Sequence, residues 1–228
     1  MERHVLIVAG GTGRRMGSAV PKQFLLLAGR PLLMHTIERM HLLCGGCGIT
    51  VVLPGEFRTM WEGLCSEHRF AVPHIVVDGG EERFYSVKRG LESITGDCLV
   101  AIHDGVRPLV SAGTVRRCFE EAAKSGAAIP VVAPPESVRM VTVRGTMTVN
   151  RESIRLVQTP QVFRLDLIRK AYEVKFNQLF TDDATVAEQA GIPVSVVEGN
   201  RENIKITTPF DIIIAGAIME TENEKLNK

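Results

Sequence analysis

The sequence lacks the features that mark membrane, secreted or nucleic-acid-binding proteins. No segment approaches the roughly 20 consecutive apolar residues of a membrane-spanning helix. The short apolar run near the N-terminus passes at once into glycines and arginines, unlike a secretory signal. The formal net charge of +1 excludes a broad electrostatic attraction to nucleic acid or to membrane surfaces. We therefore expect neither of them as a partner.

Cysteine is scarce, and its pattern indicates neither disulfides nor a zinc site. The chain has five cysteines, an odd number that is typical of reduced thiols and predicts a cytoplasmic protein. Cys44 and Cys47 follow a helical pattern, whereas a redox pair usually opens a helix. The intervening Gly45 and Gly46 are typical of a helix stop. No second cysteine pair is present to complete a zinc site.

Two common phosphate-binding loops are absent as well. The dinucleotide-binding pattern needs a third glycine where this chain has Met16, and Gly17 comes one position late. The acidic residue expected about 20 positions further on is also missing. No Gly-Lys-Ser or Gly-Lys-Thr triplet of a Walker-type loop occurs. These absences disfavour a dinucleotide-dependent dehydrogenase.

What the chain does contain is a glycine-rich loop that carries cations. After the apolar run 5–9 the sequence reads Gly10-Gly11-Thr12-Gly13-Arg14-Arg15-Met16-Gly17, and then Pro21-Lys22-Gln23. Glycine lets the main chain come close to a ligand, and consecutive N–H groups form an anion-binding concavity. Arginine and lysine supply positive charge for phosphate oxygens. The loop predicts a polyphosphate site, although a glycine-rich turn with solvated arginines has the same pattern.

Apolar runs alternate with helical patterns along a chain of 228 residues, a length typical of one domain. The predicted strands are 4–9, 49–53, 74–78, 98–103, 127–132 and 194–197. The predicted helices are 31–42, 56–67, 82–94, 112–125, 164–176, 183–190 and 209–220. The strand runs lack polar alternation, as expected for strands covered on both faces. The alternation predicts an α/β fold with a doubly wound, mainly parallel, Rossmann-like sheet, in which ligands bind at the carboxyl ends of the strands.

One segment departs from this alternation. Residues 136–150 are rich in valine and threonine with Gly145 in the middle, which predicts a protruding β-hairpin arm. Because an isolated two-stranded hairpin is marginally stable, we expect it to pack on another subunit; an edge hairpin folded onto its own domain is the alternative. We describe residues 1–228 as a single domain with a dimerisation arm at about 135–151. The polar residues 221–228 are predicted to fray.

The ends of two predicted strands carry polar residues suited to a nucleotide. After 74–78 come Gly79 and Gly80, which allow close approach of a flat base, and Ser86, whose hydroxyl can bond the edge of that base. After 98–103 comes Asp104, a candidate for holding Mg²⁺ or a ribose hydroxyl, and Arg107, a candidate for a second phosphate. Taken alone, a charged strand-to-helix turn explains the first pattern better than a base-binding site does. An Asp–Arg pair that braces the loop explains the second pattern equally well. We expect His103 to be a packed neighbour rather than a catalyst.

The C-terminal half adds further polar positions. Asp182 and Asp183 fit the start of a helix, where carboxylates suit the dipole. Lys205 lies between Ile204 and Ile206, and a lysine in such apolar surroundings costs free energy unless it meets an anion. We therefore interpret Lys205 as a functional residue.

Taken together, these segments resemble one enzyme family. The motifs Gly-x-Gly-Arg-Arg-Met, Pro-Lys-Gln, Asp-Gly-Gly-x-Glu-Arg, His-Asp-x-x-Arg-Pro, Thr-Pro-Gln, Thr-Asp-Asp and Glu-Gly-x-x-x-Asn-Ile-Lys occur in the order found in the 2-C-methyl-D-erythritol 4-phosphate cytidylyltransferases. The resemblance extends from about Val5 to Asp211. It implies transfer of CMP from CTP to a sugar-alcohol phosphate in the non-mevalonate isoprenoid pathway, with Mg²⁺ as cofactor and a homodimer interlocked by the arm.

The resemblance also implies a role for each matching residue. The CTP site is expected to consist of Ala9, Gly10, Gly11 and Gly13, with the cytosine read by Gly80, Glu81 and Ser86. Charge on the α-phosphate is expected to be stabilised by Arg15 and Lys22. The acceptor is expected to be held by Asp104, Gly105, Arg107, Ser137, Thr159, Thr181 and Lys205. Asp104 is also placed near the ribose and the Mg²⁺, and Arg151 is expected to reach the partner subunit's site.

Two positions depart from the family pattern, and two other functions remain open. The first loop has Gly10 where the family often has alanine, and the arm begins Glu136-Ser137 instead of Asp-Thr. The loss of one methyl should be tolerated, and serine keeps the hydroxyl. The nearest alternative is a ribitol-5-phosphate cytidylyltransferase. A non-catalytic nucleotide-sensing module is disfavoured because it would not require Lys22 and Lys205.

Overall fold

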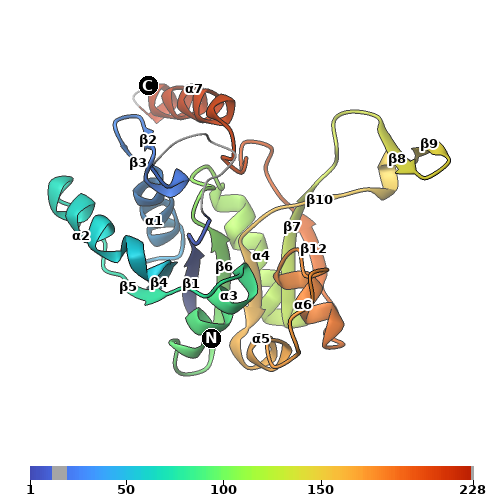
Figure 1. Ribbon diagram of the computed structural model, residues 1–228, viewed down its shortest axis with the longest axis horizontal. Coiled ribbons are helices and arrows are strands. Elements are labelled where there is room, and N and C mark those ends of the chain that lie inside the picture. The colour runs from blue at the N-terminus through green and yellow to red at the C-terminus, as the bar shows by residue number, and fades with distance from the viewer. Residues whose placement is uncertain (12–19, 227–228) are drawn as a thin grey trace.

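An eight-stranded sheet runs through the middle of the molecule (Figure 1). The structure, a computed structural model, describes residues 1–11 and 20–226. In spatial order the strands are β10 (Leu156–Val157), β7 (Ala127–Val132), β11 (Gln161–Arg164), β6 (Cys98–Asp104), β1 (Glu2–Val8), β4 (Gly48–Leu53) and β5 (Ile75–Asp78), and β12 (Ser195–Glu198) pairs with β7. β10 and β11 run antiparallel to their neighbours, and the pairings among the remaining strands are parallel.

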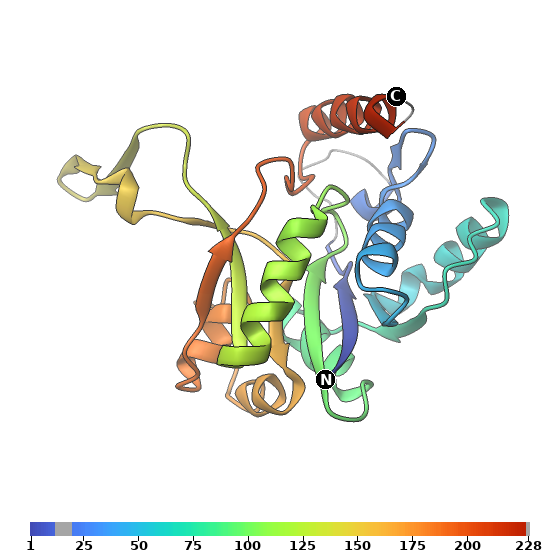
Figure 2. The ribbon, with the colours of Figure 1, turned by 180° about the vertical axis from the view of Figure 1, so that it is seen from behind.

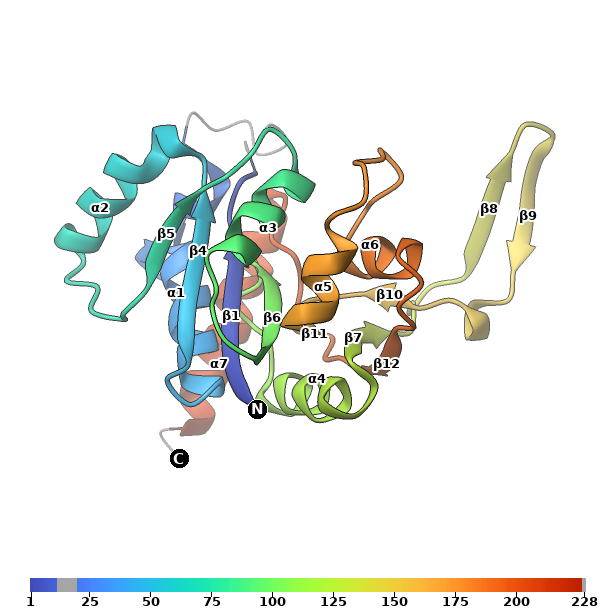
Figure 3. The ribbon, with the colours of Figure 1, turned by 90° about the horizontal axis from the view of Figure 1, so that it is seen from below.

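Helices cover both faces of this sheet, because the side chains of successive strand residues point to opposite faces. One layer consists of α1 (Leu32–Leu43), α2 (Arg58–Glu67) and α4 (Ala112–Ser125); Figure 2 shows α1 and α4 in front of the strands. The other consists of α3 (Arg83–Glu92), α5 (Leu165–Ala171) and α6 (Asp183–Gln189), on the opposite side in Figure 3. Ile7 of β1 packs into the first layer and Leu6 into the second. The predicted doubly wound, mainly parallel sheet is confirmed.

A third apolar cluster lies beyond the carboxyl ends of the strands. There α7 (Pro209–Leu226) packs through Ala215 in a cluster with Leu27, Val106 and Ile206 (Figure 1). The short pair β2 (Leu26–Leu27) and β3 (Arg30–Pro31) contributes to the same cluster. The 3₁₀ turns are η2 (Lys22–Phe24), η3 (Gly55–Phe57) and η4 (Arg151–Ser153). The cluster includes Ile206, the neighbour of Lys205, and so anchors the segment that carries this lysine.

The predicted hairpin is present as β8 (Val138–Thr142) and β9 (Gly145–Val149), paired in antiparallel register. It stands well away from the central sheet (Figure 3). Its exposed apolar side chains include Met140, Val141, Val143 and Met147. The projection agrees with the predicted arm, and what covers these side chains is taken up below.

The structure corrects two predicted helices and adds the short strands β2, β3, β10 and β11. The helix expected over 164–176 ends at Ala171, because the chain turns there and brings Tyr172, Phe176 and Phe180 against Phe84. The helix expected to end at 220, before a frayed tail, continues to Leu226. Its last turns are held by an ion pair between Glu222 and Arg39 and by a hydrogen bond from the Thr221 hydroxyl. The antiparallel strand β11 was not predicted.

Two smaller expectations concern α1 and the membrane. α1 ends at Leu43, and Gly45 and Gly46 both adopt positive φ, which confirms the predicted helix stop between the two cysteines. Within the part of the chain that the structure describes, no helix is long and apolar enough to cross a membrane.

Candidate active site

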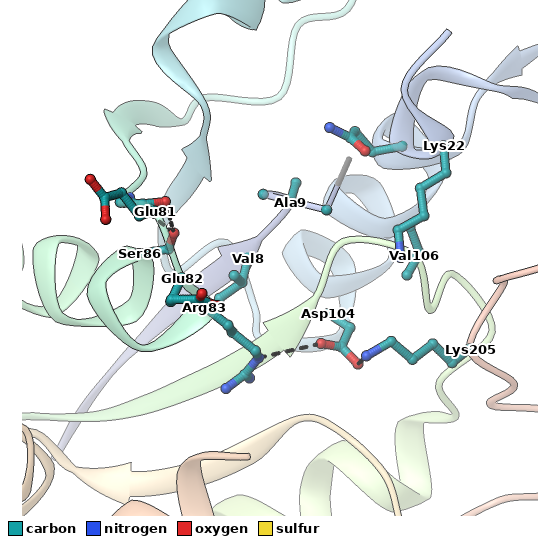
Figure 4. Close-up of a pocket in the computed structure, with 14 residues that line it drawn as sticks. Val8, Ala9, Lys22, Glu81, Glu82, Arg83, Ser86, Asp104, Val106 and Lys205 are labelled. Carbon is teal, nitrogen blue, oxygen red and sulfur yellow. Dashed lines mark hydrogen bonds and ion pairs between the residues drawn. The ribbon is translucent and has the colours of Figure 1, made fainter. Parts of the chain in front are cut away.

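A cavity opens where neighbouring parallel strands end. β1, β4 and β6 point the same way, so their carboxyl ends meet at one edge of the sheet. Main-chain hydrogen bonds of 2.9 Å from Ala9 N–H to Val52 O and from Gly105 N–H to Val8 O join the segments that follow. The cavity there has a volume of about 280 Å³ (Figure 4). Of the residues assigned from the sequence, it brings together Ala9, Gly10, Gly11, Lys22, Gly80, Glu81, Ser86, Asp104 and Lys205.

One wall of this cavity is a glycine turn held by a serine. Gly80 N–H donates to Ser86 Oγ at 3.0 Å. A Cβ on Gly80 would collide with Tyr85 Cβ, so the turn admits no side chain. Ser86 is buried, and its observed partner is the Gly80 main chain. Its contact with a base stays a prediction.

The opposite wall carries Lys22, at the start of η2. Lys22 points from this turn into the cavity (Figure 4). Phe24 anchors the turn, because its ring stacks on Trp61 with a centroid distance of 6.0 Å and meets Phe57 edge-on. The lysine is thus mounted on a turn that is fixed to the hydrophobic core. Gly13 and Arg15, also assigned to this site, lie outside the described residues.

Asp104 lines the cavity and is surrounded by three cationic side chains. Its Oδ2 lies 3.0 Å from Lys205 Nζ and 3.1 Å from Arg107 Nε, and its Oδ1 lies 4.0 Å from Arg83 Nε (Figure 4). Burial by itself would raise the pKa of the Asp104 carboxyl. The Lys205 ammonium and the two guanidinium groups outweigh that effect and hold the pKa well below its ordinary value. The carboxylate is therefore ionised and holds Lys205 at the cavity.

A buried chain of hydrogen bonds fixes the main chain of Asp104. Its N–H donates to Thr159 Oγ1 at 3.1 Å, and Thr159 Oγ1 lies 2.9 Å from His103 Nδ1. His103 Nε2 lies 2.9 Å from the Arg107 carbonyl oxygen. Burial lowers the pKa of His103 to about 4, so the ring is neutral. Because a carbonyl only accepts, we assign the ring proton to Nε2 and let the Thr159 hydroxyl donate to Nδ1. The expectation that His103 is a packed neighbour is confirmed.

A second cavity of about 240 Å³ adjoins the first. It includes five of the residues assigned to the acceptor, namely Asp104, Arg107, Thr159, Thr181 and Lys205. Arg83, Asp104 and Lys205 line both cavities, so the two meet at these three side chains. The arrangement has room for two ligands with a cationic boundary between them.

Three residues that the sequence assigned to the site line neither cavity. Gly105 lines neither cavity: its N–H bonds Val8 O, and its carbonyl accepts from the Thr36 hydroxyl. Ser137 and Arg151 are exposed at the base of the arm. The recorded hydrogen bond of Arg151 goes to the Pro135 carbonyl oxygen. Neither of them lines either cavity.

The sequence reasoning missed two residues that line the first cavity. Arg83 was noted within a motif and given no role, yet it forms ion pairs with Asp183 and with Asp104. Gln23 is fully buried, and neither polar atom of its amide has a hydrogen-bond partner among residues 1–11 and 20–226. The signal for Arg83 was its place in the first turn of a helix after two glycines; for Gln23 it was only the adjacent Lys22.

The described residues do not form a metal cage. No group of three or more His, Cys, Asp or Glu side chains among them is arranged to hold a metal ion. Asp104, the residue assigned to Mg²⁺, already faces three cations. A divalent ion at this place would need most of its oxygen ligands from a bound phosphate chain.

Comparison with known proteins identifies what this geometry resembles. A model of the 2-C-methyl-D-erythritol 4-phosphate cytidylyltransferase family matches residues 3–221. A relative of that name from Bacteroides fragilis is 53% identical over 219 residues, which cover 96% of this chain and 100% of the relative.

Solved structures agree with the sequence comparison. The crystal structure of 2-C-methyl-D-erythritol 4-phosphate cytidylyltransferase from Thermus thermophilus is 35% identical and matches with a TM-score of 0.75, covering 96% of this chain and 98% of that one. The 4-diphosphocytidyl-2C-methyl-D-erythritol synthase from Anaerococcus prevotii matches with a TM-score of 0.81 at 28% identity, covering 96% of both chains.

Proposed function

The chain belongs to the 2-C-methyl-D-erythritol 4-phosphate cytidylyltransferase family, and from this membership and the paired cavities we infer how it carries out the family's reaction. It is a CTP-dependent nucleotidyltransferase that transfers CMP to 2-C-methyl-D-erythritol 4-phosphate in isoprenoid precursor synthesis and releases pyrophosphate. The observation that carries the mechanism is that Arg83, Asp104 and Lys205 line both cavities. The nucleotide occupies the first cavity, the acceptor occupies the second, and their phosphates meet at this boundary.

The reaction itself needs no protein base. An oxygen of the acceptor phosphate forms a bond to the α-phosphorus of CTP. The bond from that phosphorus to the oxygen bridging the β-phosphate breaks, and its electron pair leaves on pyrophosphate. A phosphate monoester is largely ionised at neutral pH, so the attacking oxygen is already a nucleophile. Catalysis consists of positioning and charge stabilisation.

The cations divide these tasks between donor and acceptor. Lys22, aimed into the first cavity, stabilises the charge that grows on the α-phosphate, together with Arg15. Lys205 and Arg107 lie beside Asp104 on the acceptor side and bind the acceptor phosphate. Thr159 and Thr181 line the same cavity and are available to the polyol. The Asp104 carboxylate orients Lys205 and Arg107 and accepts from a substrate hydroxyl.

The first cavity, in which we place the nucleotide, is lined in part by residues with little or no side chain. Ala9, Gly10 and Gly11 approach the phosphates from the end of β1, and the Gly80 turn with Glu81 receives the cytosine. Gly10 and Ser86 lie near each other, since a Cβ placed on Gly10 would be at van der Waals distance, 3.6 Å, from Ser86 Oγ. We place the flat cytosine ring between these two glycine segments, which both line the cavity.

We assign Mg²⁺ to the nucleotide rather than to the protein. The ion supplies charge neutralisation of the triphosphate. Asp104 offers it one carboxylate at most, and the three cations around that carboxylate oppose a further cation. Direct contact between Asp104 and the metal stays a prediction.

The arm supports the proposal of a homodimer. An isolated two-stranded sheet with exposed Met140, Val141 and Met147 is only marginally stable in water. A second copy that covers the arm would also bring Arg151 and Ser137 to the acceptor of its partner. We place this enzyme in the cytoplasm, a proposal that its free cysteines support.

Pyrophosphate release tests the function directly. The protein is mixed with CTP, Mg²⁺ and either 2-C-methyl-D-erythritol 4-phosphate or ribitol 5-phosphate, and with ATP, GTP or UTP in place of CTP. We expect release with CTP and the methylerythritol acceptor. Faster release with ribitol phosphate would reassign the acceptor, and release that ignores the base would contradict the cytosine slot.

A further inference from the structure

The guanidinium of Arg83 is held by the buried carboxylate of Asp183. Its Nη1 donates to Asp183 Oδ1 at 2.8 Å and its Nη2 to Asp183 Oδ2 at 2.6 Å, a bidentate pair in which the carboxylate is fully buried. The Tyr172 hydroxyl donates to Asp183 Oδ1 at 2.5 Å. Burial, and then the Asp183 carboxylate, raise the pKa of Tyr172, so this hydroxyl keeps its proton. The guanidinium is therefore held in one orientation before any ligand binds.

The ion pair with Asp183 does not use all the N–H groups of Arg83. The two bonds to Asp183 use one N–H of each terminal nitrogen, which leaves Nε–H and one further N–H on each of them. Nε lies 4.0 Å from Asp104 Oδ1, beyond hydrogen-bonding distance. Arg83 lines both cavities, and its side chain extends from α3 toward Asp104 in Figure 4. The side chain that carries these donors thus lies where the two cavities meet.

We propose that Arg83 is a further catalytic residue, which donates hydrogen bonds to phosphate oxygens at the point of transfer, with Asp183 and Tyr172 as positioning residues. This inference rests on the function proposed above. A guanidinium whose orientation is already fixed stabilises the five-coordinate phosphorus without reorganisation during the step. Its charge adds to that of Lys22 on the donor side and Lys205 on the acceptor side. The bonds made and broken are those already described, and Arg83 gives up no proton.

A purely structural ion pair is the competing explanation, because breaking a buried pair destabilises a fold strongly. The chain offers a matched control. Arg30 makes a bidentate pair with Glu38 at 2.9 and 2.7 Å, outside both cavities, and the two arginines are similarly exposed, although Glu38 is 36% exposed and Asp183 is buried. Arg30→Met removes the same type of pair without touching the site.

The experiment compares Arg83→Met, Arg83→Lys, Tyr172→Phe and Arg30→Met with the wild-type protein. Thermal unfolding establishes the temperature range in which each variant is folded, and kcat and KM for both substrates are measured within it. Arg83→Met should lose at least ~10²-fold in kcat, as for a lost preorganised donor, while KM for CTP stays close to the wild-type value. Added guanidinium ion should restore part of that kcat. Tyr172→Phe should lower kcat less, and Arg30→Met should keep it.

The outcomes separate this inference from the proposed function. Absence of pyrophosphate release by the wild-type protein would refute the function itself. Wild-type activity together with near-normal kcat in folded Arg83→Met would overturn the role of Arg83 alone. A kcat loss that guanidinium does not restore, with unchanged kcat in Tyr172→Phe, would also overturn it. If Arg83→Met does not fold, Arg83→Lys and Tyr172→Phe decide: reduced kcat in both supports the proposal, and wild-type kcat in both refutes it.

Discussion

Gly11 and Lys22 approach so closely that a Cβ on Gly11 would lie 2.8 Å from Lys22 Cε. Gly11→Ala should therefore leave the fold intact, because the atom it meets belongs to a flexible side chain, and should displace the lysine amine. We expect a drop in kcat of the same sign as in Lys22→Ala, which should lose at least ~10²-fold. Steady-state kinetics of the two single variants and the double variant test this.

The decisive feature of that test is non-additivity. If Gly11→Ala acts through Lys22, it should have little further effect in the Lys22→Ala background. Gly63→Ala in α2 is a suitable control, because a Cβ there has no described neighbour within 4 Å. Full additivity of the two site variants would refute the displacement.

Gln23→Met should reveal a residue that is satisfied only when a ligand is bound. The Gln23 amide is fully buried, with no partner among the described residues, so replacement by an apolar side chain of similar size removes a desolvation penalty of about 1–3 kcal/mol. We expect the free energy of unfolding without ligand to stay equal or rise, and the affinity for CTP to fall. Urea unfolding and calorimetric titration measure the two quantities.

Gln161→Met provides the contrast for that prediction. Gln161 is buried to the same degree, but its amide donates to Asp182 at 2.8 Å and accepts from Ala184 N–H at 2.9 Å. This substitution should destabilise the protein, since it leaves both partners unsatisfied. An equal loss of stability in the two variants would show that the Gln23 amide is already satisfied in the free protein.

The contrast between Asp104 and Arg83 shows how far the sequence leads. Asp104 follows the apolar run 98–102 and His103, and such a run predicts a buried parallel strand with its chemistry at the carboxyl end. That reasoning placed Ala9, Gly80 and Asp104 at one edge, where the structure has them. The partner of Arg83 is Asp183, from a distant segment, and no local pattern specifies a long-range ion pair.

The same limit explains the secondary structure that was missed. β11 is a four-residue strand whose antiparallel place between β6 and β7 depends on tertiary pairing. From the sequence alone, the polar end of α7 is expected to fray. The structure shows that it is held by an ion pair between Glu222 and Arg39 of α1. The roles that we propose for Ser137 and Arg151 would depend on a second subunit, which a single chain does not display.

The free energy of unfolding should fall on acidification over the pH range in which His103 is neutral in the folded protein but protonated in the unfolded chain. Its pKa is lowered to about 4 in the folded protein, whereas the unfolded histidine titrates near 6.5. Between these values the unfolded state binds the extra proton, so the free energy of unfolding falls as the pH falls. Asp104 adds a loss of the same sign at lower pH, because its depressed pKa stabilises the fold only while the carboxyl is ionised.

Urea unfolding of the wild type and of His103→Gln at about pH 7 and about pH 5 measures the contribution. The variant should be less stable at the higher pH, because it disturbs the bonds to Thr159 and Arg107. It should also lose less stability on acidification than the wild type. Part of the slope will remain, since burial also lowers the pKa of His4 and His35. Equal slopes in the two proteins would contradict the buried neutral ring.

Mixing two inactive variants tests whether Arg151 serves a neighbouring protomer. Lys22→Ala disables the site in which it lies, and Arg151→Ala disables whichever site the arm reaches. If the arm acts in trans, a mixed dimer has one site with both residues intact. Random reassembly of equal amounts should then restore about a quarter of the wild-type activity, because half the dimers are mixed and half their sites are complete.

If Arg151 acts within its own protomer, every site in the mixture lacks one residue and no activity returns. The subunits must exchange for the test to be valid, so differently tagged variants are unfolded and refolded together, and mixed dimers are isolated by their two tags. Replacing the exposed Val141 by lysine should prevent both dimer formation and complementation, since the charge would have to be buried against the partner. Sedimentation of this variant as a dimer with full complementation would show that the apolar arm is not the interface.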